Sequence, residues 1–301
     1  MPRPLWSNAR TKVSGMRFLQ EQQDVISRAS SILIVGGGAL GIQYASDIAD
    51  LYPGKRVTLI HSRERLLPHF DPQLHEIALR KLLDLNVEVI LGDRVILPEG
   101  HVFEGKELDH RIISTTKGRE LESDLQLFCT GQKPNVDLVK KFLPNAVGQK
   151  DGLIKVKETM QIKAPGHNVP HMFAVGDCID AFGAIKAGHT GWGLYLRMVL
   201  RENSRHTYSL LMYNSWNQAT IAAKNILSIV QARETGSPLS LEDYVPTKPM
   251  ISLSVGLSQS VKQMIGKDGE LVVSEHVGED VDSHWEAMWS ALGVLADDPF
   301  I

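Results

Sequence analysis

Cysteine is scarce in this 301-residue chain, which contains only Cys129 and Cys178. Two isolated cysteines exclude a disulfide-stapled scaffold, a four-cysteine zinc site and a closely spaced redox pair, and they suit a reducing compartment. No apolar run reaches the roughly 18 residues that a membrane-spanning helix needs. The first ten residues, MPRPLWSNAR, lack the apolar centre of a secretory signal. We therefore expect a soluble, cytoplasmic protein.

Charge of one sign is also lacking. The 32 basic and 35 acidic residues give a net charge of -3. Because no block of Lys and Arg dominates, general electrostatic binding of nucleic acid is not expected. The 11 histidines show no metal-binding spacing such as HExxH, so no metal site is predicted. No GxSxG turn is present, which disfavours an α/β-hydrolase.

What the chain does contain is a strand that runs directly into a cluster of glycines. SILIV leads into GGGALG, and a helical pattern and a second apolar strand follow. Strand, glycine turn, helix and strand within about 30 residues predict one βαβ unit, which a further helix and strand extend into a parallel sheet. The expected strands cover 31–35, 55–60 and 87–91, and the expected helices begin near 39 and 73.

The rest of the chain changes character. Short alternating segments over 94–123 predict an antiparallel β-meander, and apolar runs predict strands over 125–130 and 172–175. Helical patterns cover 16–30 and 217–231, and the last sixty-odd residues resemble a small α+β unit.

Gly36, Gly38 and Gly41 have the spacing of a dinucleotide-binding turn. In that pattern the first glycine permits the tight turn, the second lets the backbone approach a pyrophosphate, and the third allows close helix–strand packing. The helix that begins near Ala39 and Leu40 offers free N–H groups and its positive dipole end to the phosphates. A purely structural glycine turn is the alternative that this pattern alone leaves open.

The end of the second strand bears on which dinucleotide would bind. An acidic residue there would hydrogen-bond the ribose 2′-OH of NAD, but this chain has His61-Ser62-Arg63. Nothing repels a 2′-phosphate, and Arg63 is available to bind one. In the other interpretation Arg63 lies on the adenine or faces solvent, so the cofactor is written NAD(P)H.

Six segments follow one another in a definite order: SILIVGGGALGIQ, VTLIHSR, CTGQKPN, MFAVGDC, GAIKAGHTGW and NQATIAAKNI. Taken together, they resemble the pyridine nucleotide–disulfide oxidoreductase superfamily. Within it the chain is most similar to the apoptosis-inducing-factor-like branch, in particular to its ferroptosis-suppressor type and the fungal relatives of that type. Such proteins are flavoenzymes that bind FAD, take hydride from NAD(P)H and pass electrons to a quinone or another acceptor.

The resemblance also implies roles for individual residues. The three glycines would cradle the NAD(P)H pyrophosphate, with His61 and Arg63 around the adenosine ribose. Gln43 stands where relatives often carry Glu near the nicotinamide–flavin face. The lack of a CxxxxC pair fits a branch in which electrons leave the flavin without a protein disulfide.

Four further residues would belong to the FAD side. Gly131 matches the second dinucleotide signature, and Gly176 with Asp177 matches the turn whose aspartate holds the ribityl hydroxyls. Lys186 matches a lysine beside the isoalloxazine ring, where it would stabilise negative charge on reduced flavin; a solvated surface lysine is the alternative. Gln43 and Lys186 are the candidate catalytic residues.

The chain departs from the family pattern in two places. The family opens with its own strand–GxGxxG–helix unit for the ADP half of FAD, and this sequence begins beyond it, so we expect half of an FAD site to be missing. Residues 193–216 stand where the pattern would run directly from Trp192 into Asn217. They are either a lineage-specific insertion or translated intron sequence.

A helix with Trp285, Met288 and Trp289 on one face is expected near the end of the chain. Core packing, a homodimer seam and peripheral membrane contact are its three interpretations. Because quinones dissolve in bilayers, peripheral attachment to a membrane or lipid-droplet surface, or an association with mitochondria, also stays open.

The predicted fold class is α/β, with a Rossmann-type NAD(P)-binding domain inserted in a partial FAD-binding domain and a small α+β C-terminal domain. The predicted function is FAD-dependent oxidation of NAD(P)H with a quinone-like acceptor. The alternatives are an inactive nucleotide-binding remnant or incomplete gene model, and a flavin-free dehydrogenase. The predicted divisions are 1–28 (connection from the missing FAD half-domain), 29–122 (NAD(P)H domain with the meander), 123–235 (remainder of the FAD domain) and 236–301 (C-terminal domain).

Overall fold

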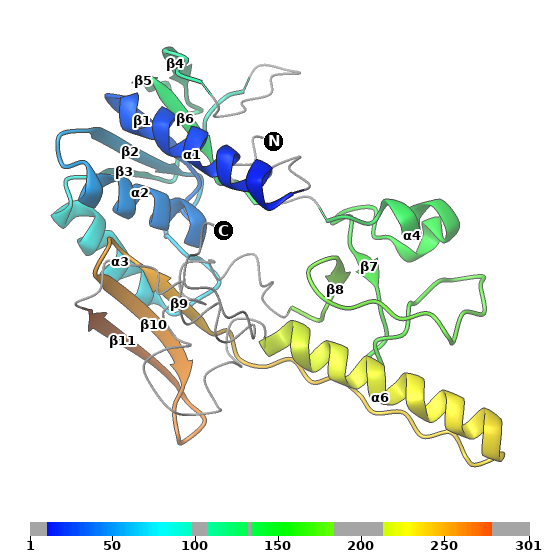
Figure 1. The fold of residues 1–301 in the computed structure, drawn as a ribbon. Coiled ribbons are helices and arrows are strands. Elements are labelled where there is room, and N and C mark those ends of the chain that lie inside the picture. Colours follow the sequence, from blue (N-terminus) through cyan, green and yellow to red (C-terminus); the bar gives the residue numbers. More distant parts are fainter. Residues whose placement is uncertain (1–10, 98–106, 132–133, 184–212, 279–301) are drawn as a thin grey trace. The chain divides into compact units, whose positions relative to one another are not determined.

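The computed structural model describes residues 11–97, 107–131, 134–183 and 213–278 (Figure 1). They fall into two compact units. Described residues up to Gly131 and from Ile251 onward belong to the first unit, and those from Gln132 to Met250 belong to the second.

Four parallel strands form the centre of the first unit, in the order β3-β2-β1-β6. β1 is buried at all five positions because it lies between β2 and β6. Val35 at its end pairs with Ile60 of β2, so the segments that follow these two strands begin at the same edge of the sheet. The strands are β1 (Ser31–Val35), β2 (Arg56–His61), β3 (Glu88–Leu91) and β6 (Leu125–Phe128).

Helices α2 (Ala39–Leu51) and α3 (Pro72–Asp84) pack beside this sheet and against each other (Figure 1). α2 follows the glycine turn after β1 and buries a row of apolar side chains. α3 begins at Asp71, whose carboxylate accepts a hydrogen bond from the Gln73 N–H at 2.9 Å, as an N-cap does. α1 (Lys12–Arg28) precedes β1. The α/β fold with a parallel Rossmann-type sheet is the predicted fold class, and it is confirmed.

A two-stranded hairpin of β4 (Arg111–Ser114) and β5 (Glu120–Ser123) represents the predicted meander. The buried carboxylate of Asp93, just after β3, holds the hairpin turn by accepting hydrogen bonds from the hydroxyls of Thr115 at 2.7 Å and Thr116 at 3.0 Å. Burial would raise the pKa of Asp93, but these hydrogen bonds outweigh it and hold that pKa below its usual value.

A three-stranded antiparallel sheet completes the first unit, in the order β11-β10-β9. It packs on α2 and α3: the Gln43 amide donates to the Ser254 hydroxyl at 2.9 Å, and Arg80 pairs with Glu275 at 2.6 Å. Its strands are β9 (Ile251–Ser254), β10 (Gln259–Ile265) and β11 (Leu271–Val277).

The compact units and the predicted divisions differ in two places. β6 lies within the predicted 123–235 segment but pairs with β1 of the first unit. β9–β11 lie within the predicted C-terminal domain, 236–301, but are grouped with the first unit. In both places, hydrogen bonds between residues distant in sequence decide the grouping. The predicted Trp-rich helix lies outside the described residues.

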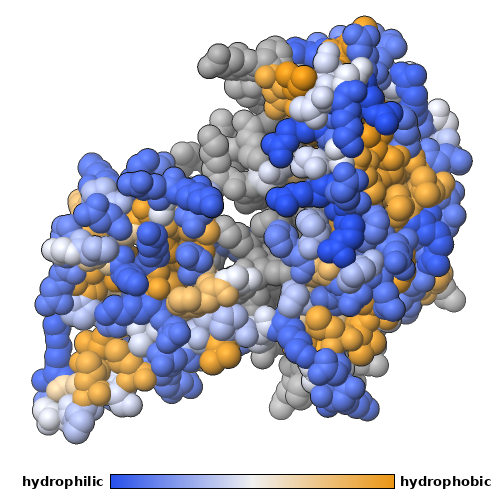
Figure 2. Space-filling model, turned by 180° about the vertical axis from the view of Figure 1, so that it is seen from behind, coloured by the Kyte–Doolittle hydropathy of each residue, from blue (hydrophilic) through white to orange (hydrophobic). Residues whose placement is uncertain are grey.

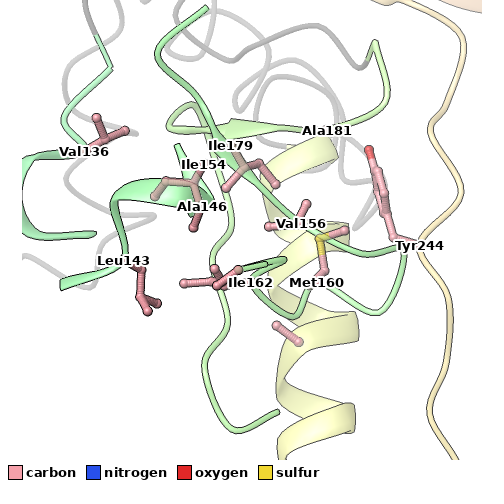
Figure 3. Packing of buried hydrophobic residues seen from close by; sticks show 12 residues of the cluster. Val136, Leu143, Ala146, Ile154, Val156, Met160, Ile162, Ile179, Ala181 and Tyr244 are labelled. Carbon is pink, nitrogen blue, oxygen red and sulfur yellow. The ribbon is translucent and has the colours of Figure 1, made fainter. Parts of the chain in front are cut away.

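The second unit is held by one apolar cluster (Figure 3). Ile154, Val156, Met160 and Ile162 point toward one another beside α6, with Ile179 from β8 above them. The unit's elements are α4 (Asp137–Phe142), β7 (Ile154–Lys155), β8 (Ile179–Asp180) and α6 (Tyr213–Thr235), with a 3-10 turn at Pro144–Ala146.

The prediction of a strand over 172–175 is wrong. Only Phe173 forms a bridge, with Gln161, and all four residues are half-buried. The run does lie beside residues 160–162, since the Ile162 N–H donates to the Met172 carbonyl at 2.8 Å and the Ala174 N–H donates to the Met160 carbonyl at 3.1 Å. This pairing is confined to the single Phe173–Gln161 bridge and is too short to form a strand.

α6 is held by polar side chains on its buried face. Asn225, 1% exposed, donates to the carbonyls of Thr159 and Glu242 and accepts from the Glu242 N–H. The other face exposes Leu227. Figure 2 shows hydrophobic residues scattered among hydrophilic ones on the surface. Among the described residues no helix has the length and apolar character to cross a membrane.

Candidate functional site

The glycine turn after β1 is tight because of Gly36. Its φ of 121° lies in the region that side-chain-bearing residues rarely adopt. A Cβ there would stand 2.5 Å from the Cys129 carbonyl oxygen, while the Gly36 N–H donates to the Ile60 carbonyl at 2.8 Å. This glycine is therefore required by the sheet itself.

Gly41 brings α2 onto β1. A Cβ at Gly41 would lie 1.8 Å from the carbonyl oxygen of Gly36, so any side chain would push the helix away from the strand. This is the close helix–strand packing that the third glycine of the pattern predicts.

Gly38 differs from both. Its φ of -84° and ψ of -178° suit any residue, and none of the described atoms lies within 4 Å of where its Cβ would be. It caps α2 without a side-chain hydrogen bond, so the first-turn N–H groups, those of Ala39 and Leu40 among them, have no side-chain cap. Open space beside an uncapped helix N-terminus fits the pyrophosphate of a dinucleotide.

The loop after β2 covers this turn. The Leu67 N–H donates to the Gly37 carbonyl at 3.1 Å, and a Cβ on Gly37 would stand 2.5 Å from Leu66 and 2.8 Å from the His61 ring. The Leu66 N–H in turn donates to Nδ1 of His75 at 3.1 Å. Sequence reasoning missed Gly37, Leu66 and His75, because the motif treats position 37 as variable.

His61 ends β2, next to the glycine turn. Burial, then the charge of Arg63, lowers the pKa of His61, while a hydrogen bond to the Arg65 backbone partly offsets this. Its Nε2 atom is buried and has no hydrogen-bond partner among the described residues. Arg63 is exposed.

Gln43, predicted near a nicotinamide–flavin face, is buried on α2 and donates to Ser254. This contact gives Gln43 a structural role, tying α2 to β9. Its catalytic assignment stays a prediction.

The predicted FAD residues fall in different places. Gly131, with φ 93°, is exposed after β6. In the second unit Gly176 has φ 85°, and its N–H donates to Oε1 of the buried Gln218 at 2.8 Å; Asp177 beside it is half-buried. Sequence reasoning missed Gln218, which anchors the turn from α6. Lys186 lies outside the described residues, and so do residues 193–212 of the predicted insertion. The remaining residues of that insertion, 213–216, form the first turn of α6.

Neither cysteine forms a disulfide bond. Burial raises the pKa of Cys129 to about 12, so its reactive thiolate is scarce at neutral pH. Cys129 belongs to the first unit and Cys178 to the second. In the described ranges, no three His, Cys, Asp or Glu side chains gather where they could hold a metal ion.

A parallel sheet with a glycine turn, an uncapped helix and a polar strand end defines the dinucleotide-binding class of α/β proteins. The family model described as pyridine nucleotide-disulphide oxidoreductase matches residues 5–222. The chain belongs to this family, as the sequence predicted.

Curated relatives agree with the predicted branch. The chain is 39% identical to Fe-regulated protein 8 of Mycosarcoma maydis over 99% of this chain and 66% of that protein. It is 29% identical to ferroptosis suppressor protein 1 of Homo sapiens over 90% and 64%, and 26% identical to apoptosis-inducing factor homolog B of Dictyostelium discoideum over 83% and 59%. The chain thus spans just under two thirds of the length of these relatives.

Solved structures share the fold. A water-forming NADH oxidase from Lactobacillus brevis bound to NADH superposes with a TM-score of 0.52 at 19% identity, over 95% of this chain and 48% of that one. A ferredoxin reductase from Rhodopseudomonas palustris also gives a TM-score of 0.52 at 19% identity, over 85% and 51%.

Proposed function

We propose that this chain binds NAD(P)H at the glycine turn and FAD at the Gly176–Asp177 turn, and acts as an FAD-dependent NAD(P)H oxidoreductase. The observation that carries the proposal is the open space at Gly38. Packing explains Gly36 and Gly41, but no contact in the described chain explains a glycine at 38. A phosphate that must approach the backbone does explain it.

Each residue of the turn has a separate task in this proposal. The backbone N–H groups of Ala39 and Leu40 donate to pyrophosphate oxygens, and the positive end of α2 favours their negative charge. His61 and Arg63, at the end of β2, lie on the side of the adenosine ribose. Leu66, packed on Gly37, keeps the loop closed over the turn.

On the flavin side, Asp177 accepts hydrogen bonds from ribityl hydroxyls. Its position follows from Gly176, whose positive φ and hydrogen bond to Gln218 fix the turn. The half-buried carboxylate of Asp177, on a turn of fixed conformation, suits this role. Lys186 is proposed beside the ring by family resemblance only.

The chemistry that the two bound cofactors supply is hydride transfer from NAD(P)H to flavin, with electrons leaving for an acceptor. We propose a quinone-like acceptor. The raised pKa of Cys129 supports transfer without a protein thiol relay, because a thiol with such a pKa is hardly ionised to the nucleophilic thiolate at neutral pH. Peripheral membrane contact and a homodimer remain proposals that rest on the helical sequence pattern around Trp285.

Relatives support the oxidoreductase proposal over a catalytically inactive remnant. One, from Flammulina velutipes, is named an FAD-dependent oxidoreductase and is 28% identical over 57% of this chain. Another, from Ajellomyces capsulatus, is named an oxidoreductase and is 26% identical over 75%.

The test is a visible absorption spectrum of the purified 301-residue chain with and without added FAD, followed by anaerobic addition of NADH or NADPH. A stoichiometric flavin band that bleaches supports the proposal. A folded chain that binds NADH but shows no flavin band removes the FAD part of the proposal. A folded chain that binds neither removes the whole of it.

A further inference from the structure

The loop between β2 and α3, residues 62–70, packs on the glycine turn. Leu66 is fully buried and Leu67 is 3% exposed. A Cβ on Gly37 would come within 2.5 Å of the Leu66 side chain, and the Leu67 N–H donates to the Gly37 carbonyl at 3.1 Å. The position of Gly37, and with it the path of the backbone into Gly38, therefore depends on how this loop is held.

Leu67 has a backbone conformation that needs support. Its φ of 49° lies in the left-handed region that a residue with a side chain seldom adopts, and such a conformation persists only where the surrounding structure holds it. Within the loop, the Phe70 N–H donates to the Leu67 carbonyl at 3.0 Å, and the Arg65 guanidinium donates to the Pro68 carbonyl at 3.3 Å. Helix α3 supplies a further support through His75.

His75, in the first turn of α3, accepts a hydrogen bond from the loop. The Leu66 N–H donates to its Nδ1 atom at 3.1 Å. A ring nitrogen that accepts carries no proton, so in this arrangement the ring is neutral and its hydrogen is on Nε2. A second proton would go to Nδ1 and turn the acceptor into a donor that faces the Leu66 N–H. Protonation of His75 and this hydrogen bond therefore exclude one another.

We propose that His75 is a positioning residue for the glycine turn: the unprotonated ring holds Leu66 and Leu67 on Gly37, and protonation releases them and weakens binding of the dinucleotide. This proposal rests on the proposed dinucleotide site. Because coupling between two binding events is reciprocal, binding of the dinucleotide favours the unprotonated ring. Binding should therefore release protons at a pH where His75 is partly protonated.

The surroundings of His75 set the pH range of this effect. Burial, then the charge of Arg65, lowers the pKa of His75, and Glu76 partly offsets this. Helix α3 also packs against α2, β3 and β10, whose charged residues are Asp47, Asp50, Glu88 and Lys262. An unperturbed histidine has a pKa of about 6.5. The hydrogen bond is therefore fully present above about pH 6.5 and is lost as the pH falls through the lowered pKa of the folded chain.

The experiment measures binding of ADP-ribose by calorimetric titration between pH 7.5 and 5.5, which needs no flavin and no turnover. Two buffers with different heats of ionisation are used, so that the protons released on binding are counted. His75→Asn is the decisive variant, because its side-chain oxygen takes the place of Nδ1 and accepts at every pH. It should bind like the natural chain at pH 7.5, and it should lose less affinity and release fewer protons as the pH falls.

Two further variants complete the comparison. His75→Phe keeps a ring without an acceptor, and it should bind ADP-ribose roughly 2- to 12-fold more weakly at pH 7.5, the effect of one hydrogen bond. His69→Asn is the matched control, since His69 is exposed on the same loop, and it should change neither the affinity nor its pH dependence. His61 also has a lowered pKa, but the natural chain and His75→Asn both contain it, so any difference between these two chains belongs to His75.

The outcomes separate the two proposals. If the folded natural chain binds no ADP-ribose at any pH, the dinucleotide site is contradicted, and the role of His75 falls with it. If the natural chain and His75→Asn show the same pH dependence and the same release of protons, the role of His75 is overturned while the site stands. Binding by His75→Phe at pH 7.5 as tight as that of the natural chain overturns it too. Should His75→Phe not fold, the comparison with His75→Asn decides on its own.

Discussion

Replacing Gly38 by alanine should separate ligand binding from folding. The backbone angles at Gly38, φ -84° and ψ -178°, are open to alanine, and the added methyl group meets no described atom within 4 Å. Because alanine restricts the unfolded chain more than glycine does, the free energy of unfolding should stay within about 1 kcal/mol of the natural value or rise slightly. In the bound state, however, the methyl group stands where the pyrophosphate must approach.

The expected loss of affinity follows from the hydrogen bonds that the phosphate can no longer make. One bond to a charged group contributes about 1.5–3 kcal/mol, and about 1.4 kcal/mol corresponds to a factor of ten in affinity. Gly38→Ala should therefore weaken binding of ADP-ribose roughly 10- to 150-fold. Calorimetric titration measures the affinity, and urea unfolding measures the stability.

Gly41→Ala is the matched control for this prediction. Its methyl group would stand 1.8 Å from the Gly36 carbonyl oxygen, so α2 must shift and the free energy of unfolding should fall by about 1–3 kcal/mol. If Gly38→Ala binds ADP-ribose as well as the natural chain does, no phosphate lies on Gly38 and the turn is structural. If it unfolds as easily as Gly41→Ala, the claim of open space is wrong.

Three further results are expected. Gln218→Leu leaves the N–H of the half-buried Gly176 without its acceptor, so urea unfolding should show a loss of about 0.5–1.5 kcal/mol and FAD titration a lower affinity. Hydrogen bonds, first from His110, hold the pKa of Asp124 at about 2; the stability they supply is present above the unfolded pKa and is lost as the pH falls toward 2. The melting temperature of Asp124→Asn should thus lie below that of the natural chain at neutral pH and approach it in acid. Cys129, whose pKa is about 12, should resist iodoacetamide at pH 8 in the folded chain and react after unfolding, as peptide mass spectrometry would show; rapid labelling of the folded chain would contradict the raised pKa.

The βαβ unit could be predicted almost to the residue because its signals are local. β1 begins and ends where SILIV does, and α2 begins at Ala39, directly after the glycines. Both boundaries depend on apolar periodicity and on residues that permit a tight turn. Both signals lie within a few residues of sequence.

The strand pairings and the position of the last sheet could not be predicted in this way. β9 is tied to α2 through Gln43 and Ser254, which are 211 positions apart, and no periodicity in either segment indicates the other. The apolar run at 172–175 pairs with residues 160–162 only around Phe173, and the local sequence does not indicate how far such a pairing extends.

The three adjacent glycines show why a motif alone could not define the candidate site. Gly36 is required by its backbone angle and by the Cys129 carbonyl, and Gly37 by the His61 ring and Leu66. Neither the backbone angles nor a close contact requires a glycine at position 38. The pattern marks positions 36, 38 and 41 alike, but two of these serve the fold, and the unmarked Gly37 is needed because a side chain there would meet the His61 ring and Leu66. Gly38 is therefore the one glycine of the turn that packing does not explain, and the substitution there is the sharpest test of the proposed dinucleotide site.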